Sequence, residues 1–426
     1  MLRRLCAMGV VVGLSLGGLI GCEQAPEHRF TIAVIPDTQN YLDYLHQKNE
    51  GFPIDAVAQF YAQMNYIAQN ARSRGGDIAF VTSVGDVWQH ATMGIDAAHQ
   101  AAGHTAISDD HIPAALRPDD RARTVEMPAA IDGYNLLKGV VPFSVAPGNH
   151  DYDGFWLSAQ HPPEPSKNPY GQVHYNGLSN FVSVFGAESA FFRDEEYYVG
   201  SFNGGADSAT VFTAGGYSFL HIALEMQPAD DVLAWAQSMM DAYPGRPTII
   251  SMHEFLNTKA ERKPSVYLNL KTIHSEHNDP EDIWRKLIRP NDQVFLVLSG
   301  HFHGQARRMD VNEAGHAVHQ LLSDYQDRRQ SYLDAGGDPK APFSAVGDGW
   351  MRLMQFDFSG ATPRLTVRTY STHYEQFARD HEAYVAHYRD HEQPGMSDAD
   401  FIAEDEFTLD LDDFTQRFGA PSDDRF

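Results

Sequence analysis

Short apolar runs that alternate with helical stretches are the feature that most restricts the fold of this chain. The runs are rich in β-branched and aromatic residues, which is typical of buried strands. Between them, apolar residues recur at helical spacing over residues 53–71 and 230–242. Strands that alternate with helices predict an α/β fold. We expect strands at residues 30–35, 78–84, 140–145, 217–224, 248–252 and 294–298, and two later strands at 351–358 and 364–372.

Five of the expected strands end in a polar cluster. In open α/β sheets, ligands bind beyond the carboxyl ends of the strands, so we expect the five clusters to meet in one cleft. Their carboxylates, amides and imidazoles, without any thiolate, suit Mn, Fe or Zn. The residues that we expect to ligate metal are Asp37, Gln39, Asp86, Asn149, His253, His301 and His303.

The order of these motifs carries a resemblance. Asp-x-Gln, Gly-Asp, Gly-Asn-His-Asp, His and Gly-His-x-His resemble the calcineurin-like metallophosphoesterase family over roughly residues 30–375. The resemblance implies a four-layer α-β-β-α sandwich of two mixed sheets and a phosphoesterase that uses two divalent metal ions. It implies one ion held by Asp37, Gln39 and His303, a second held by Asn149, His253 and His301, and Asp86 bridging both.

The resemblance also implies a mechanism. A metal-bridged hydroxide would attack phosphorus while His150 assists the leaving group, with Asp151 orienting the His150 ring. Gln39 stands where the family usually has histidine, so we expect weaker metal binding or a different metal preference at the first site. Gln89 stands where the family usually has aspartate, and whether Gln89 or His90 ligates metal stays open.

Two functional alternatives stay open from the sequence. The substrate could be a phosphomonoester or a phosphodiester, because the family includes both chemistries. The altered first and second motifs also leave open a non-catalytic function, in which the chain is a lipid-anchored metal-binding or scaffold module on the same fold. The histidine that follows Asn149 favours the enzyme, since metal binding alone needs no such group.

The N-terminus has the features of a targeting segment. Arg3 and Arg4 precede an apolar stretch, residues 10–16, that is too short to span a bilayer. The sequence that ends in Gly21 and Cys22 resembles a bacterial lipobox, which implies a signal peptide over residues 1–21 and a lipid on Cys22. An ordinary signal peptide with an incidental cysteine is the alternative. Glu23, where an inner-membrane retention signal would have aspartate, favours the outer membrane, and we expect a cell-envelope protein in the periplasm or on the cell surface.

The charge of the chain restricts its partners. The formal net charge is −25, and such a body repels polyanions at long range. We therefore expect no wrapping of nucleic acid and a small phosphoester as substrate, with contact to a membrane only through the lipid anchor. Both cysteines, Cys6 and Cys22, lie in the N-terminal segment, so the folded body contains no disulfide framework.

The remaining segments frame the expected catalytic domain, residues 30–375. Residues 22–29 are expected to be a tether, residues 91–130 and 152–210 loop-rich insertions, and residues 376–426 a solvated acidic extension with some helix. The aromatic residues of the second insertion either wall the cleft or pack the insertion itself. His221, inside an apolar strand, is expected to be a core histidine. His104, His111, His161 and His174 are expected in loops.

Overall fold

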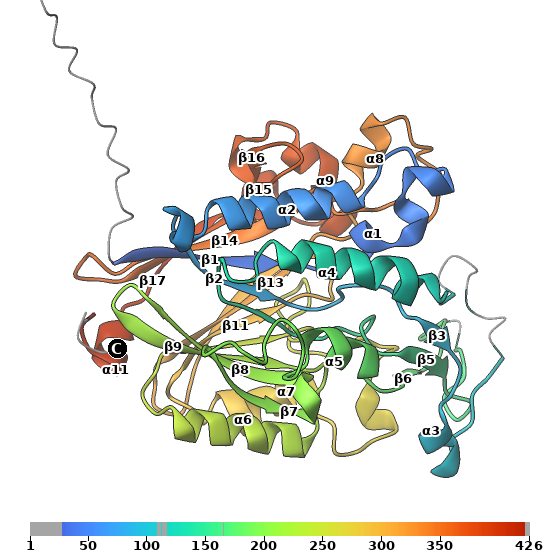
Figure 1. Ribbon diagram of the computed structural model, residues 1–426, viewed down its shortest axis with the longest axis horizontal. Helices are drawn as coiled ribbons and strands as arrows, with labels where there is room; N and C mark the ends of the chain where they lie inside the picture. Colours follow the sequence, from blue (N-terminus) through green and yellow to red (C-terminus); the bar gives the residue numbers. More distant parts are fainter. Residues whose placement is uncertain (1–27, 109–111, 113–116, 165, 422–426) are drawn as a thin grey trace, which may run out of the picture.

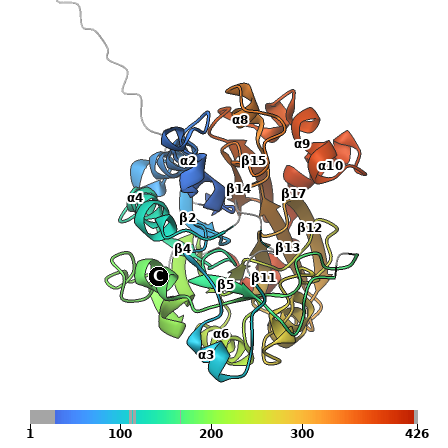
Figure 2. The same ribbon diagram turned by 90° about the vertical axis from the view of Figure 1, so that its right-hand side faces the viewer.

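The computed structural model of this protein describes residues 28–108, 112, 117–164 and 166–421. The expected signal peptide, Cys22 and most of the tether lie outside the described residues. Two large sheets face each other, and helices cover the outer face of each (Figure 1, Figure 2). The predicted four-layer sandwich of two mixed sheets is confirmed.

The first sheet brings the N-terminal strands beside strands from the end of the chain. Its order is β16-β15-β14-β1-β2-β4, and β17 pairs with β15. β1 is parallel to β2 and antiparallel to β14, so the sheet is mixed. Its strands are β1 (Arg29–Ile35), β2 (Ile78–Ser83), β4 (Phe143–Val145), β14 (Trp350–Asp357), β15 (Arg364–Ser371), β16 (Gln376–Phe377) and β17 (Phe407–Asp410).

The second sheet has the order β12-β13-β11-β10-β9-β8-β7. Its central strands β9, β10, β11 and β13 are parallel, so their carboxyl ends meet at one edge. The strands are β7 (Tyr198–Phe202), β8 (Asp207–Ala214), β9 (Tyr217–Leu224), β10 (Thr248–Met252), β11 (Val294–Ser299), β12 (Gly304–Val311) and β13 (Ala317–Asp324). β7, β8, β12 and β13 were not predicted from the sequence.

Alternation along each strand divides the apolar core into layers. Phe30, Ile32 and Val34 of β1 pack in the cluster between the two sheets. Ala33 and Ile35 point the other way, into the cluster under α2 (Val57–Gln69) and α4 (Met127–Asn135). A third cluster lies between the second sheet and α6 (Asp230–Ala242). Each sheet is therefore buried on both faces.

The other helices are short. At α7 (Pro280–Ile283), the side chain of Asp279 accepts a hydrogen bond from the backbone N–H of Asp282 at 2.9 Å, as expected for an N-cap before proline. No helix in the described ranges is both long and apolar enough to cross a lipid bilayer. The remaining helices are α1 (Gln39–Leu42), α3 (Ala97–Ala101), α5 (Ser179–Phe185), α8 (Gln330–Asp334), α9 (Tyr384–Glu392), α10 (Asp398–Asp405) and α11 (Phe414–Phe418).

The two insertions meet in a small third sheet. Its order is β3-β5-β6, with β3 at Thr92–Met93, β5 at Gly154–Leu157 and β6 at Val173–Tyr175. β5 and β6 form an antiparallel ribbon beside one end of the two large sheets (Figure 1). The insertions that looked loop-rich in the sequence thus contain a sheet of their own.

The C-terminal extension differs from the expected solvated tail. Asp405 is buried, and one of its carboxylate oxygens accepts a hydrogen bond from the Arg352 guanidinium at 3.0 Å. Glu392 forms a second buried pair with Arg328 at 2.7 Å. Phe414 and Phe418 fill the cluster between the sheets. The acidic residues of this segment neutralise buried arginines of the body, which the excess of acidic residues alone did not reveal.

Candidate metal centre

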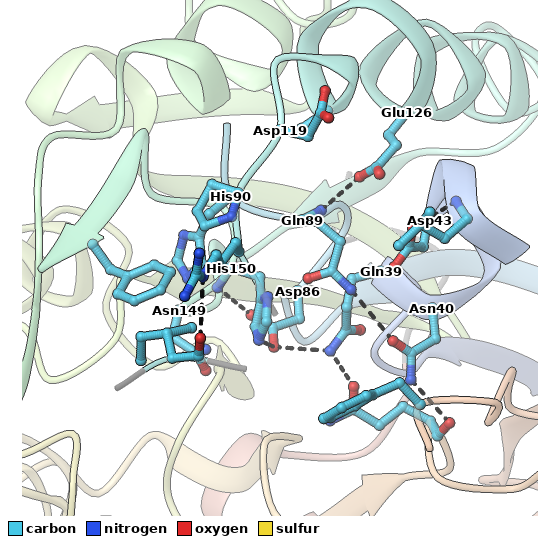
Figure 3. Close-up of a pocket in the computed structure, with 18 of the residues that line it drawn as sticks. Gln39, Asn40, Asp43, Asp86, Gln89, His90, Asp119, Glu126, Asn149 and His150 are labelled. Atoms are coloured by element: carbon cyan, nitrogen blue, oxygen red, sulfur yellow. Dashed lines mark hydrogen bonds and ion pairs between the residues drawn. The ribbon is translucent and has the colours of Figure 1, made fainter. Parts of the chain in front are cut away.

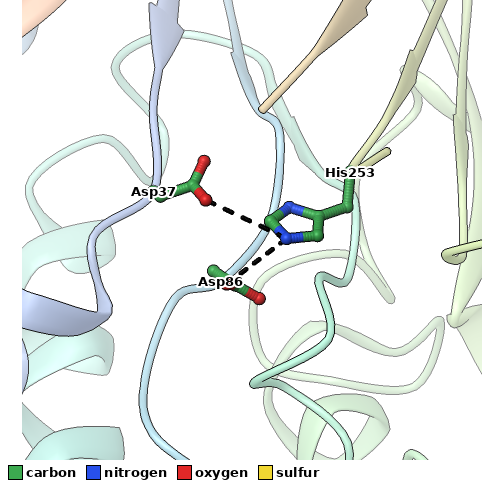
Figure 4. A group of neighbouring side chains, drawn as sticks. All are labelled: Asp37, Asp86 and His253. Atoms are coloured by element: carbon green, nitrogen blue, oxygen red, sulfur yellow. Dashed lines mark ion pairs between the residues drawn. The ribbon is translucent and has the colours of Figure 1, made fainter. Parts of the chain in front are cut away.

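Three buried side chains converge where the two sheets meet. Asp37 follows β1, Asp86 follows β2, and His253 follows β10, so the first sheet supplies two of them and the second sheet one (Figure 4). One ligand atom from each lies within 4.8 Å of the other two. The Nε2 atom of His253 is 3.3 Å from Asp86 Oδ2 and 3.9 Å from Asp37 Oδ2. Two carboxylates and an imidazole in this arrangement could bind a metal ion.

His253 is held in the tautomer that a metal ligand needs. Its Nδ1 lies 2.9 Å from the carbonyl oxygen of Val84, which can only accept a hydrogen bond. Nδ1 therefore keeps its proton, and Nε2 is the nitrogen that faces the two carboxylates and would ligate a cation. His253, which was predicted from the sequence to lie in the cleft, is completely buried at the centre of this group.

Glycines in the motifs let the loops approach the carboxylates. A Cβ atom on Gly148 would lie 2.2 Å from Asp86 Oδ1, and one on Gly300 would lie 2.2 Å from Asp37 Oδ1. Asp86 itself has a φ of 53°, a left-handed conformation that aspartate adopts more readily than most residues. The Gly-Asn-His and Gly-His motifs thus require glycine because a side chain would occupy the space of a carboxylate.

Gln39 and Asn149 lie beside this group. The amide nitrogen of Gln39 donates a hydrogen bond to Asp86 Oδ2 at 3.2 Å and another to Gln326. Asn149 Oδ1 is 3.0 Å from His253 Nε2. Two oxygens here, Oδ1 of Asp37 and Oε1 of Gln39, are buried without a hydrogen-bond partner among the described residues. Such oxygens suit a cation, because burial without a partner is otherwise costly.

His301 and His303 line the same pocket but interact with other carboxylates. His301 Nε2 is 3.6 Å from Glu254 Oε1. His303 Nδ1 is 2.5 Å from Asp327 Oδ2, and 44% of its side chain is exposed. Burial alone would lower the pKa of His303, but the hydrogen bond to Asp327 and the charge of Asp324 raise the pKa to about 9. The structure therefore places both histidines at the rim of the group, and their assignment to separate ions stays a prediction.

His150 reaches the group from the loop after β4. Its backbone N–H donates to Asp86 Oδ1 at 2.8 Å, and its ring Nε2 is 3.9 Å from Asp86 Oδ2. The ring stacks on that of His90, with centroids 4.8 Å apart. Burial, with help from the charge of His150, lowers the pKa of His90 to about 3, so the stacked partner is neutral. His90 thus supports the ring of His150, and its own Nδ1 lies 3.3 Å from the carbonyl oxygen of Tyr152.

The expected role of Asp151 is wrong. Its carboxylate accepts hydrogen bonds from the backbone N–H groups of Gly148 at 2.7 Å and Val87 at 2.9 Å. Nδ1 of His150 has no hydrogen-bond partner among the described residues. Since both oxygens of Asp151 are taken by the backbone, this residue fixes the loop after β2 against the loop after β4 and does not orient the His150 ring.

Sequence reasoning missed three residues at the end of β13. Asp324, Gln326 and Asp327 contact the site through Asp37, Gln39 and His303 respectively. β13 is parallel to β11, so its carboxyl end lies at the same edge as the other clusters. Their sequence signal is weak, because His319 and Gln320 interrupt the apolar positions of residues 317–324.

The electrostatics of the buried carboxylates call for a counter-charge. Burial, reinforced by the charges of Asp324 and Asp86, raises the pKa of Asp37 well above its ordinary value. Burial on its own would also raise the pKa of Asp86, but the charges of His253 and His150 hold it below its ordinary value. A divalent cation would remove the repulsion between the carboxylates and favour their ionised forms.

The group opens into a pocket of about 510 Å³. Figure 3 shows Asp86, Asn149 and His150 on one side of it and Asp43 and Glu126 on another. Gln89 and His90 line it as well. Burial raises the pKa of Glu126 to about 8, and the charge of Asp43 adds to this shift. The Phe and Tyr residues that line the pocket are Tyr44, Phe155, Tyr170, Tyr175, Tyr267 and Phe343. Three of these six belong to the second insertion, which therefore forms part of the wall of the cleft.

Comparison with known proteins agrees with this geometry. Residues 30–305 match the family described as calcineurin-like phosphoesterase. The chain is also similar to a Bacillus subtilis (strain 168) protein named "Uncharacterized protein YvnB", with 26% identity over 243 residues. That alignment covers 55% of this chain and 15% of the Bacillus protein, so the chain spans well under two thirds of its relative. The family match and the buried Asp–Asp–His group together fit a metal-dependent hydrolase. Because the match takes in more than half of its residues, this protein belongs to the calcineurin-like phosphoesterase family.

Proposed function

We propose that this protein hydrolyses small phosphoesters with the help of two divalent metal ions at the centre around Asp86. The observation that carries the proposal is the convergence of Asp37, Asp86 and His253 from three strand ends beneath an open pocket. The proposed ligands are those of the sequence prediction: Asp37, Gln39, Asp86, Asn149, His253, His301 and His303.

The residues present fit such ions. The donors are carboxylate, amide and imidazole groups, which suit Mn, Fe or Zn. Asp37 and Gln39 each offer a buried oxygen that has no hydrogen-bond partner in the described part of the chain. Two divalent ions, when bound, supply a nucleophile from water at neutral pH and stabilise charge on the phosphoryl oxygens.

The side chains of the protein supply the rest of the chemistry. The backbone N–H of His150 fixes Asp86, and Asp86 lies next to His253 of the second sheet. His150, supported by the ring of His90, assists the leaving group by giving it a proton or a hydrogen bond. Asp151 keeps this loop in place through its bonds to Gly148 and Val87.

The pocket favours small organic phosphoesters, whether monoesters or diesters. A volume of about 510 Å³ is typical of sites for small molecules. Its aromatic walls give apolar surface to an organic group, while the phosphate would lie over Asp86 and His150. The net charge of −25 disfavours polyanionic polymers.

A panel of aryl phosphomonoesters and phosphodiesters, run with Mn²⁺, Fe²⁺ and Zn²⁺, tests the activity. We expect His150→Ala to lower kcat by roughly 10²–10⁴-fold with metal content unchanged, and Asp86→Asn to lose both activity and metal. His316→Ala, just before β13 at the opposite end of that strand from Asp324 and paired with Asp292, is the matched control and should behave like the wild type. No turnover of any ester by wild type that holds its metal would reject the enzyme and favour the non-catalytic scaffold.

We also propose that the protein is anchored in the cell envelope through a lipid on Cys22. The order of basic residues, apolar stretch, small residue and cysteine supports this. Detergent phase partition of cells that express the whole chain should place the wild type in the detergent phase and Cys22→Ala in the aqueous phase. Equal partition of the two proteins would reject the anchor.

A further inference from the structure

Three histidines outside the metal centre lie with their rings together. His99 belongs to α3, His104 follows that helix, and His274 lies in the loop after the short 3-10 helix at Leu270–Thr272. The ring centroids of His99 and His274 are 5.1 Å apart, and that of His104 is 6.0 Å from each. Residues that are distant in the sequence thus bring three imidazoles to one point, which we name the histidine cluster.

The inner nitrogens of two of these rings face each other. Nε2 of His99 lies 2.9 Å from Nε2 of His274. Nδ1 of His99 is 2.8 Å from Asp96 Oδ2, and Nδ1 of His274 is 3.7 Å from Glu276 Oε1. The carboxylate of Asp96 keeps a proton on Nδ1 of His99 and leaves the lone pair of its Nε2 free, as it does for histidines that bind metal. The short contact between the two Nε2 atoms is then either an N–H···N hydrogen bond from His274 or a cation shared by two lone pairs, and the metal content of the protein separates the two.

The spacing of two of the rings fits ligation of one ion by imidazole, and the third ring lies close by. With metal–nitrogen bonds of about 2.0–2.1 Å, tetrahedral ligation separates neighbouring imidazole centroids by roughly 5 Å. His99 and His274 already have this separation, and the ring of His104, 6.0 Å from each, would have to turn towards them to ligate the same ion. Trp156 packs beside the cluster, with its ring centroid 5.4 Å from that of His99, and provides the apolar surroundings that favour a bound ion.

The cluster lies on the opposite side of the β5–β6 ribbon from the pocket. Phe155 and Tyr175 of this ribbon line the pocket. Their neighbours Trp156 and His174 point the other way, because side chains alternate along a strand, and Trp156 meets the histidine cluster. Figure 1 shows α3 next to β5 and β6. An ion at the cluster would tie residues 96–104 to residues 272–276 and so brace the wall of the pocket from behind.

We propose that His99, His104 and His274 form a binding site for a transition-metal ion of the Zn²⁺ type, separate from the metal centre around Asp86. Imidazole suits Zn²⁺, Cu²⁺ and Ni²⁺, while a site without ligating carboxylates is poor for Mg²⁺ and Mn²⁺. The role of the site is structural, to hold the first insertion against the loop that follows residue 270. The proposal does not rest on the phosphoesterase activity.

The test measures Zn²⁺ per chain by mass spectrometry after the whole chain is stripped with chelator and dialysed against Zn²⁺. We compare wild type, His99→Ala with His274→Ala, and the control His316→Ala, whose histidine is likewise paired with a carboxylate. Wild type and control should hold one Zn²⁺ more per chain than the double variant. In an Asp86→Asn background, which impairs the metal centre, the same difference of one ion should remain.

A second pair of variants covers the case in which the double variant fails to fold. His99→Gln and His274→Gln keep the size and polarity of the side chains, and far-UV circular dichroism checks their fold. Each should lower Zn²⁺ affinity at one site at least tenfold in a titration. Equal Zn²⁺ content and affinity in wild type and folded variants would overturn the proposal and leave the cluster as a hydrogen-bonded packing of histidines.

Discussion

At the scale of single residues, His221 shows how burial sets the pH range in which the protein is stable. Its ring is fully buried and contacts the hydroxyl groups of Thr82 at 3.1 Å and Ser251 at 2.8 Å, as expected for a core histidine. Burial lowers its pKa to about 3. The folded protein therefore keeps His221 neutral at a pH where the unfolded chain, with a histidine pKa of about 6.5, already binds a proton.

We expect the free energy of unfolding to fall as the pH drops below about 6.5, and His221 to account for up to about 1.4 kcal/mol per pH unit of that fall. His221→Gln should flatten the slope by this amount, because glutamine keeps a polar group there without titrating. Urea unfolding at several pH values from 7.5 to about 4.5 measures the slope of the free energy of unfolding against pH in both proteins. An unchanged slope would contradict the assignment, and the exposed His391→Gln serves as the control.

At this scale, the predicted convergence of strand ends is seen for Asp37, Asp86 and His253, which together could hold a metal ion. Asp37, Asp86 and His253 were predicted because each follows a recognisable buried strand, and the fold brings such ends together. The partner of Asp151 could not be predicted, since only the loop geometry decides whether its carboxylate meets an imidazole or backbone N–H groups. His174 was expected in a loop but is buried in β6, because the insertion builds its own sheet.

At the scale of elements, the C-terminal extension is part of the core. The ring centroid of Phe414 in α11 lies 4.9 Å from that of Phe358, 5.1 Å from that of Phe295 and 5.2 Å from that of Tyr217. Phe414 therefore joins both sheets from the open end of the sandwich. β17 adds to this by pairing with β15 over residues 407–410.

Phe414→Ala should lower the free energy of unfolding by about 3–5 kcal/mol, because it leaves a cavity among aromatic rings that cannot collapse freely. Phe343→Ala, the matched control at a ring that is 46% exposed, should cost less than about 1 kcal/mol. Denaturant unfolding of both variants measures the difference. A loss below about 1 kcal/mol for Phe414→Ala would mean that the segment behaves as the solvated tail that its composition suggested.

The strands β12 and β13, which were not predicted from the sequence, both lack a continuous apolar run. β12 carries Arg307, Arg308 and Asp310 and lies at an edge of its sheet with exposed positions, so it has no continuous apolar run. β13 carries His319 and Gln320 in its middle. The central strands, by contrast, are buried on both faces and stand out as apolar runs. Prediction from one sequence therefore found the strands with continuous apolar runs and missed strands interrupted by polar residues, and with β13 it missed Asp324.

At the scale of the whole molecule, the metal centre lies across the seam between the two sheets. Asp37 and Asp86 come from one sheet, while His253 and Asp324 come from the other. With no cation, the buried carboxylates repel each other, and this repulsion contributes to the raised pKa of Asp37. An ion bound there would hold the two sheets together.

Chelation should therefore lower the melting temperature of the whole protein, and Mn²⁺ should restore it. The stabilisation is about 2.7 kcal/mol when free metal is one hundred times its Kd, for each site. Differential scanning calorimetry with EDTA, with and without excess Mn²⁺, checks this. The melting temperature of Asp86→Asn should respond far less to either addition, and an equal response in both proteins would show that the stabilising ion binds elsewhere.

The wall of the pocket and its floor have separate origins in the chain. Strand ends of the two large sheets form the floor, whereas the β5–β6 ribbon of the insertions provides Phe155 and Tyr175 of the aromatic wall. Mutations in the ribbon can therefore accumulate while the strand ends keep their positions, provided that the contacts of Phe155 and Tyr175 with His90 are kept. In a lineage of such proteins, the insertions are where new substrate ranges would arise, and they are the segments to exchange when a member is engineered for a different ester.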